Sequence, residues 1–195
     1  MFKWYRISLL VIFFLNACVS DEDLKKGFAD ATRLKWEQFK GSAPNDSNNN
    51  AVAYSSTRIS FHCNDGELVD TYKACKVSFY FDEYASWVSK GRDFDSSRIL
   101  EHESGHYRLT AIYAKKLGNI ILKNKWETYA RKEDIDAVAS KLQRELSDVQ
   151  LQYDEETSHS NNIVLQRKWD SLIIEDLIHS FKRPSELKRM NNFNP

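Results

Sequence analysis

Residues 97–117 read SRILEHESGHYRLTAIYAKKL, and apolar side chains recur among them every three or four positions. This spacing predicts an amphipathic helix over the whole stretch. Within it, residues 102–106 spell H-E-S-G-H, which matches the pattern H-E-x-x-H. Residues four apart lie on the same face of a helix, so His102 and His106 can bind one metal ion.

The residues between the two histidines indicate a reaction. A glutamate directly after the first histidine completes the signature of a zinc-dependent hydrolase, usually a peptidase. Glu103 can reach a water on the metal, which predicts a catalytic role as general base. Gly105 costs helix propensity and leaves room for backbone or substrate close to the metal. The expected cofactor is Zn2+, because this metal suits two imidazoles and a third donor.

A catalytic zinc ion usually has three protein ligands, so the motif needs a partner from elsewhere in the chain. The longer pattern H-E-x-x-H-x-x-G-x-x-H is excluded, because Leu109 and Ile112 stand where it requires glycine and histidine. Candidates cluster in residues 153–159. We expect His159 to be the third metal ligand. Asp154 is the alternative, either as a ligand or as acceptor of a hydrogen bond from a ligand histidine.

Two tyrosines lie near the expected site. Peptide hydrolysis also needs a donor for the oxyanion that the carbonyl oxygen becomes when water attacks the carbonyl carbon. We predict Tyr153 in this catalytic role, with Tyr107 as the alternative. For each ring, packing in the core is the competing interpretation.

The start of the chain has the features of an export signal. Lys3 and Arg6 precede a short apolar run that ends in Leu15-Asn16-Ala17-Cys18. This arrangement predicts a signal peptide over residues 1–17. The last four residues resemble a bacterial lipobox, with Asn16 in place of the usual small residue. We therefore expect lipidation at Cys18 and anchoring in the cell envelope, with a plain signal peptide and a coincidental cysteine as the alternative. Val19 follows the cysteine in place of aspartate, which by resemblance to Gram-negative lipoproteins favours the outer membrane, facing the periplasm.

The mature chain is expected to contain a tether at residues 18–33 and one domain at residues 34–195. The signal removes two of the 28 basic residues, which leaves 26 against 28 acidic ones and a formal charge of −2. Without a basic surplus, nucleic acid is not an expected partner. Cys63 and Cys75 form an even pair in an exported protein, which predicts a disulfide. Free thiols or metal ligands are the alternatives.

The remaining segments predict an α+β fold. Residues 51–88 are β-rich, with alternating strands at 57–63 and 75–81 and a turn at Asn64-Asp65-Gly66. The disulfide would pin the ends of this hairpin-like unit. Residues 77–81 could pair with an extended peptide at a sheet edge, or form an interior strand. Two further helices are expected at about 132–156 and 162–179, so that an N-terminal β-rich part precedes three main helices.

Four stretches resemble one known family in their order and spacing. They are LKWEQFKG at residues 34–41, the strand region from Ala51 to Phe61, HESGHY at 102–107, and YDEETSHS at 153–160 with Gln166 and Trp169-Asp170 behind it. The chain is similar to the bacterial family of predicted secreted zinc-dependent proteases, domain of unknown function 922. The resemblance implies an exported, zincin-like metallopeptidase fold and no particular substrate. Ser160 departs from it, because glycine is expected in the turn that presents His159.

These features predict an exported zinc-dependent metallopeptidase that acts on a peptide or protein in the cell envelope. A metal-dependent amidase that cuts peptidoglycan peptides is a related alternative. A non-catalytic envelope lipoprotein, acting as a binding or scaffold module, is the alternative from another class. Asp154 and His159 together could close a four-ligand structural zinc site in such a protein.

Overall fold

The computed structural model describes residues 32–44, 51–89, 96–126 and 130–181. The predicted signal peptide, the lipidation at Cys18 and all but the last two residues of the predicted tether lie outside the described residues. Thr32, within the predicted tether, is already buried, and its hydroxyl accepts a hydrogen bond from Nε of Arg108 at 3.1 Å. No helix among the described ranges is long and apolar enough to cross a membrane.

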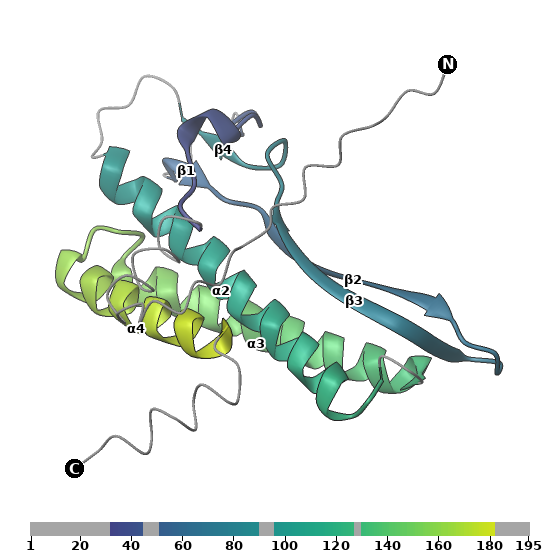
Figure 1. The fold of residues 1–195 in the computed structure, drawn as a ribbon. Helices are drawn as coiled ribbons and strands as arrows, with labels where there is room; N and C mark the ends of the chain where they lie inside the picture. Colours follow the sequence, from purple (N-terminus) through teal and green to yellow (C-terminus); the bar gives the residue numbers. More distant parts are fainter. Residues whose placement is uncertain (1–31, 45–50, 90–95, 127–129, 182–195) are drawn as a thin grey trace, which may run out of the picture.

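The N-terminal half is built from antiparallel strands, as predicted. Strand β2 (Thr57–Asp65) pairs along its length with β3 (Thr71–Phe81), and the short β5 (Ala130–Arg131) pairs with the beginning of β3. A second, two-stranded sheet joins β1 (Ala53–Tyr54) to β4 (Trp87–Val88). The long β2–β3 hairpin extends beside the helices (Figure 1).

The predicted disulfide between Cys63 and Cys75 is present. It crosses the hairpin close to its turn and does not pin the open ends of the strands. The register shifts between His62 and Asn64, so two residues of β3 oppose one of β2. Ala74 occupies this bulge with a φ of 52°, a left-handed conformation that bulges commonly require.

Three helices follow strands β1 to β4, with β5 between the first two helices, which confirms the predicted α+β order. They are α2 (Ser96–Lys123), α3 (Lys132–Thr157) and α4 (Ile163–Phe181). Helix α2 extends six residues beyond its predicted end at Leu117. Gly118 disfavours a helix by about 1 kcal/mol, but Leu117 and Ile121 are 1% and 2% exposed, so their burial outweighs that cost.

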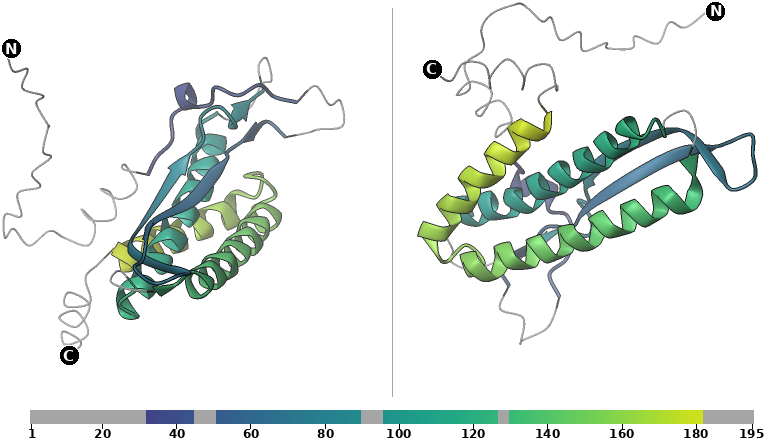
Figure 2. Two further views of the ribbon diagram at one scale, coloured as in Figure 1. Left: turned by 90° about the vertical axis from the view of Figure 1, so that its right-hand side faces the viewer. Right: turned by 90° about the horizontal axis from the view of Figure 1, so that it is seen from below.

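Helix α2 lies at the centre of the molecule, with β2 and β3 along one side and α3 and α4 on the other (Figures 1 and 2). The apolar core lies mainly among the three helices, and strand residues such as Val77 and Phe79 pack against it. A short 3-10 helix, η1 (Trp36–Gln38), belongs to a segment that docks on α2. The amide of Leu34 in this segment donates to Oγ of Ser104, within the H-E-x-x-H motif.

Candidate metal centre

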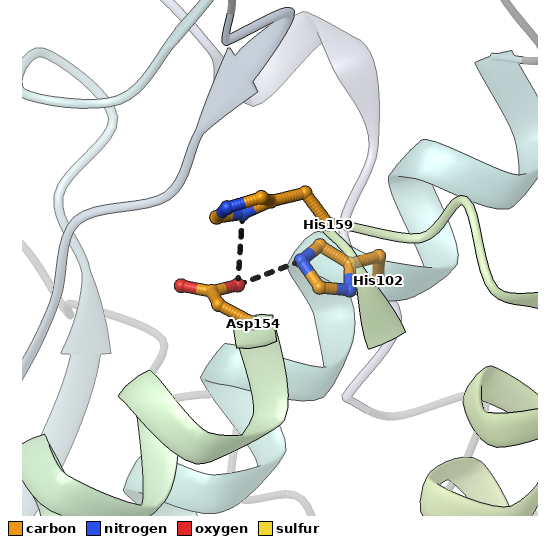
Figure 3. Close-up of side chains that lie close together, drawn as sticks. All are labelled: His102, Asp154 and His159. Atoms are coloured by element: carbon orange, nitrogen blue, oxygen red, sulfur yellow. Dashed lines mark hydrogen bonds and ion pairs between the residues drawn. The ribbon is translucent and has the colours of Figure 1, made fainter. Parts of the chain in front are cut away.

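The structure brings together four donor residues from two helices and one turn. His102 and His106 lie one turn apart on α2, Asp154 lies near the end of α3, and His159 follows in the turn before α4. Figure 3 shows the imidazoles of His102 and His159 directed at the same oxygen of the Asp154 carboxylate, with His159 above it and His102 beside it. The donor atoms of His102, Asp154 and His159 all lie within 4.8 Å of one another, a group that could hold a metal ion.

One oxygen of Asp154 is the meeting point of the group. Its Oδ1 lies 3.0 Å from Nε2 of His102 and 3.0 Å from Nε2 of His106. Nδ1 of His159 lies 3.5 Å from the same oxygen. His102 is 3% exposed, whereas the His159 side chain is 76% exposed. Asp154, the alternative ligand of the sequence analysis, therefore contacts both motif histidines directly, and the preferred His159 contacts Asp154.

The turn that presents His159 has an unusual backbone. Ser158, His159 and Ser160 have φ values of 48°, 50° and 71°, so three consecutive non-glycine residues are left-handed. A φ of 71° suits glycine, the residue that the family resemblance leads us to expect at Ser160. The Ser160 hydroxyl is also buried and makes no hydrogen bond to any residue that the structure describes. Left-handed backbone at a cluster of polar donors is typical of a functional site.

The charges of the four donor residues favour a cation bound between them. Burial raises the pKa of Asp154, but hydrogen bonds from His102 and His106 outweigh it and hold this pKa well below its ordinary value. Burial lowers the pKa of His106, but the hydrogen bond to Asp154 and the negative charge of Glu103 more than offset it, so this pKa is raised. A site that holds a carboxylate ionised beside imidazoles suits a divalent cation.

Glu103 lies beside this group and is 6% exposed. Its carboxylate makes no hydrogen bond or ion pair with the residues in the described part of the chain, and its backbone oxygen faces the Ser55 hydroxyl. A cleft of about 660 Å³ lies over the site. Segment 51–58 forms one wall, and Glu103 lines the cleft together with all four donor residues. A carboxylate in this position can hold a water that the metal polarises.

The predicted catalytic role of Tyr153 does not fit its position. Tyr153 is fully buried behind His102, and the two rings stack with centroids 4.6 Å apart. Its hydroxyl donates to the backbone oxygen of His102 at 3.2 Å and accepts a hydrogen bond from Gln166 at 2.6 Å. Tyr107, the alternative, packs its ring against Phe79 in β3. Neither tyrosine lines the cleft, and both pack as aromatic side chains against their neighbours.

Gly105 makes room for Tyr153 and not for substrate. A Cβ atom at position 105 would lie 2.3 Å from the Tyr153 hydroxyl oxygen. The absent side chain therefore lets this hydroxyl reach the backbone of His102. The sequence analysis correctly predicted that Gly105 leaves room beside the motif. It expected backbone or substrate in that room, which was wrong, because the Tyr153 side chain of α3 fills it.

Sequence reasoning did not assign a role to Gln166 or Asp170. Oε1 of Gln166 lies 3.0 Å from Nδ1 of His102, and its amide nitrogen donates to Oδ1 of Asp170 at 2.8 Å. Gln166 is 4% exposed. Burial raises the pKa of Asp170, partly countered by the hydrogen bond from Gln166. A four-residue spacing of two polar residues on the buried side of a helix was the available signal.

The donor set fits zinc. Zinc–nitrogen and zinc–oxygen bonds of about 2.0–2.2 Å in a tetrahedral site hold neighbouring ligand atoms about 3.3 Å apart. The contacts of Asp154 Oδ1 with the three histidines, at 3.0, 3.0 and 3.5 Å, bracket that separation. Imidazole and carboxylate are both donors that zinc accepts.

Comparisons with protein families, with curated proteins and with solved structures find no match to this chain. The family resemblance in the sequence therefore stays a prediction, and the functional argument depends on the site itself.

Proposed function

We propose that this protein is a zinc-dependent hydrolase that cleaves peptide bonds. The observation that carries the proposal is the convergence of His102, His106 and Asp154 at 3.0 Å contacts, beside the buried Glu103 and under a cleft. We assign the first three as inner zinc ligands. His159, the most exposed of the four donor residues, is the outer donor at the open side.

The chemistry divides between the metal and Glu103. Zinc in this site would supply Lewis-acid chemistry, polarising a water and the carbonyl to be cleaved. Glu103 would accept the proton of the attacking water and deliver a proton to the leaving amine. His159 is available to donate a hydrogen bond to the oxyanion, the role that the position of Tyr153 does not support.

Segment 51–58 supports an extended peptide as the substrate class. The backbone oxygens of Val52 and Ser56 accept hydrogen bonds from the amides of Ser89 and Asp82. Ala53 in β1 directs its backbone groups away from β4, because these groups alternate along a strand, and Ala53 lines the cleft. A peptide could pair with that edge. The sequence analysis considered residues 77–81 for this purpose, but they belong to β3 and do not line this cleft.

The location that we propose is the bacterial cell envelope, with a lipid anchor at Cys18 and an envelope peptide or protein as the substrate. The Cys63–Cys75 disulfide supports export, because disulfides persist in oxidising compartments. A metal-dependent amidase that acts on peptidoglycan peptides belongs to the same proposal with a narrower substrate.

One observation favours a second candidate function. Four donor residues lie at the site, and simultaneous binding by all four would leave no position for water. The protein would then be a binding or scaffold module with a structural zinc ion. The peptidase proposal instead requires one coordination position for water or substrate.

The test is Glu103→Gln in the zinc-loaded protein, assayed with a library of quenched fluorescent peptides. We expect zinc to be retained and cleavage to fall at least about a hundredfold, because a general base contributes that much. Glu155→Gln, at an exposed position of α3, is the matched control and should cleave like the wild type. Equal cleavage by Glu103→Gln, or none by the zinc-loaded wild type, would contradict the proposal and favour the binding module.

A further inference from the structure

Gln166 of α4 contacts Nδ1 of His102, the ring nitrogen that does not face Asp154. We infer that Gln166, held in one orientation by Asp170, is the positioning residue that prepares His102 to bind the metal. This inference rests on the proposed zinc site and goes beyond it, because neither residue lines the cleft. It assigns a specific task to a buried polar network that connects α4 to the motif helix.

The orientation of the Gln166 amide is fixed by its other partners. Its nitrogen donates to the Tyr153 hydroxyl at 2.6 Å and to Oδ1 of Asp170 at 2.8 Å. Oδ1 of Asp170 accepts one of these hydrogen bonds, which places the NH2 end of the amide toward Asp170. Both amide protons are then used, and the carbonyl oxygen faces Nδ1 of His102 at 3.0 Å.

That orientation selects the useful form of His102. A carbonyl oxygen only accepts, so Nδ1 of His102 must carry the proton and donate it. Without a metal, Nε2 donates to Asp154 at 3.0 Å. When zinc takes the place of that proton, the proton on Nδ1 stays with Gln166, so the Nε2 lone pair is the one left free for the metal. A reversed amide would favour the proton on Nε2, where it would block metal binding.

Tyr153 fixes the same imidazole in a second direction. The two rings lie 4.6 Å apart and nearly parallel, at 17°. The Tyr153 hydroxyl holds the backbone oxygen of His102 and is itself held by Gln166. The network therefore restrains both the tilt of the ring and its position on α2. The amide of Gln166 and the hydroxyl of Tyr153 have all their polar atoms paired, and satisfied polar groups make a buried network rigid.

The experiment is a measurement of zinc affinity by competition with a chelator, for the wild type and Gln166→Met. Methionine has nearly the same shape and no carbonyl oxygen. We expect Gln166→Met to bind zinc about 10- to 100-fold more weakly, the range typical for loss of a partner to a ligand histidine. Gln143→Met, at an exposed position of α3, is the matched control and should bind like the wild type.

A reciprocal double variant provides the readout that a merely structural role would not move. In Gln166→Glu/Asp170→Asn, the new carboxylate accepts from Nδ1 of His102, and the new amide at 170 donates back to it. We expect this variant to bind zinc at least fivefold more tightly than Gln166→Met. In the zinc-loaded protein, nitrogen-edited NMR should also detect a solvent-protected Nδ1 proton of His102 in the wild type and the double variant.

Zinc binding by Gln166→Met within about threefold of the wild type would overturn the inference and leave the proposed function intact. If Gln166→Met does not fold, a double variant that binds at least 10-fold more weakly than the wild type overturns it as well. A wild type that binds no zinc would instead contradict the proposed function, so the two failures are distinguishable.

Discussion

Replacement of Gly105 by alanine tests how tightly α3 is fitted to the motif helix. The new Cβ would lie 2.3 Å from the Tyr153 hydroxyl oxygen and 2.7 Å from Cζ of the same ring. Normal contact requires about 3.5 Å, so the ring would have to retreat by about 1 Å. Tyr153 is 0% exposed and lies between His102 and Trp169, with centroid distances of 4.6 and 5.4 Å, so it has little space to move.

The expected cost follows from three contributions. Overpacking in a core costs about 1–3 kcal/mol. Loss of the two hydrogen bonds of the Tyr153 hydroxyl costs about 1 kcal/mol each. Alanine gains about 1 kcal/mol over glycine in helix propensity. The net prediction is a loss of about 2–4 kcal/mol in the free energy of unfolding.

The assay is urea unfolding followed by circular dichroism, with a chelator present so that metal binding does not contribute. Gly118→Ala is the matched control, since it lies on the same helix and its Cβ would meet no atom within 4 Å. We expect this control to gain about 0.5–1 kcal/mol from helix propensity alone. Gly105→Ala/Tyr153→Phe should be less destabilised than the sum of its single variants, because it removes the closest clash. Gly105→Ala as stable as the control would refute this account of the site.

Two further predictions concern the turn and the metal. Ser160→Gly should stabilise the protein by about 1 kcal/mol in the same urea assay, because it relieves left-handed backbone and removes an unpaired buried hydroxyl. A loss of stability in this variant would contradict the left-handed conformation of Ser160. Zinc affinity should fall as the pH is lowered from 8 to 6. The pKa of His106 is raised, so His106 binds a proton at a higher pH than an ordinary histidine does, and zinc must displace that proton. Chelator competition at pH 6, 7 and 8 measures this effect, and a constant affinity would count against His106 as a ligand.

Local patterns were sufficient to predict the three helices and the β2–β3 hairpin, but not β5, which lies between α2 and α3. Helix periodicity located α2, α3 and α4, and strand alternation located the hairpin, because these signals come from residues close in sequence. The end of α2 was predicted too early, since the burial of Ile121 depends on tertiary packing. The bulge at Ala74 also had no clear local signal, because it depends on the register between two strands.

The candidate site was predictable only in part. His102, His106 and Glu103 follow from one motif, because helix geometry alone places them together. The relation of Asp154 to the motif depends on how α3 packs on α2, and no spacing within either helix specifies it. The same packing buries Tyr153, which is why its predicted catalytic role did not fit the structure.

The proposal that His102, His106 and Asp154 hold zinc is tested most directly by metal content. The measurement is elemental mass spectrometry of the purified protein after zinc is supplied and excess is removed, for the wild type, His102→Ala and Asp154→Ala. His62→Ala, at an exposed position of β2, controls for loss of an unrelated histidine. The account predicts one zinc ion per chain in the wild type and the control, and almost none in the other two variants. A wild type without zinc, or an Asp154→Ala variant that retains it fully, would contradict the account.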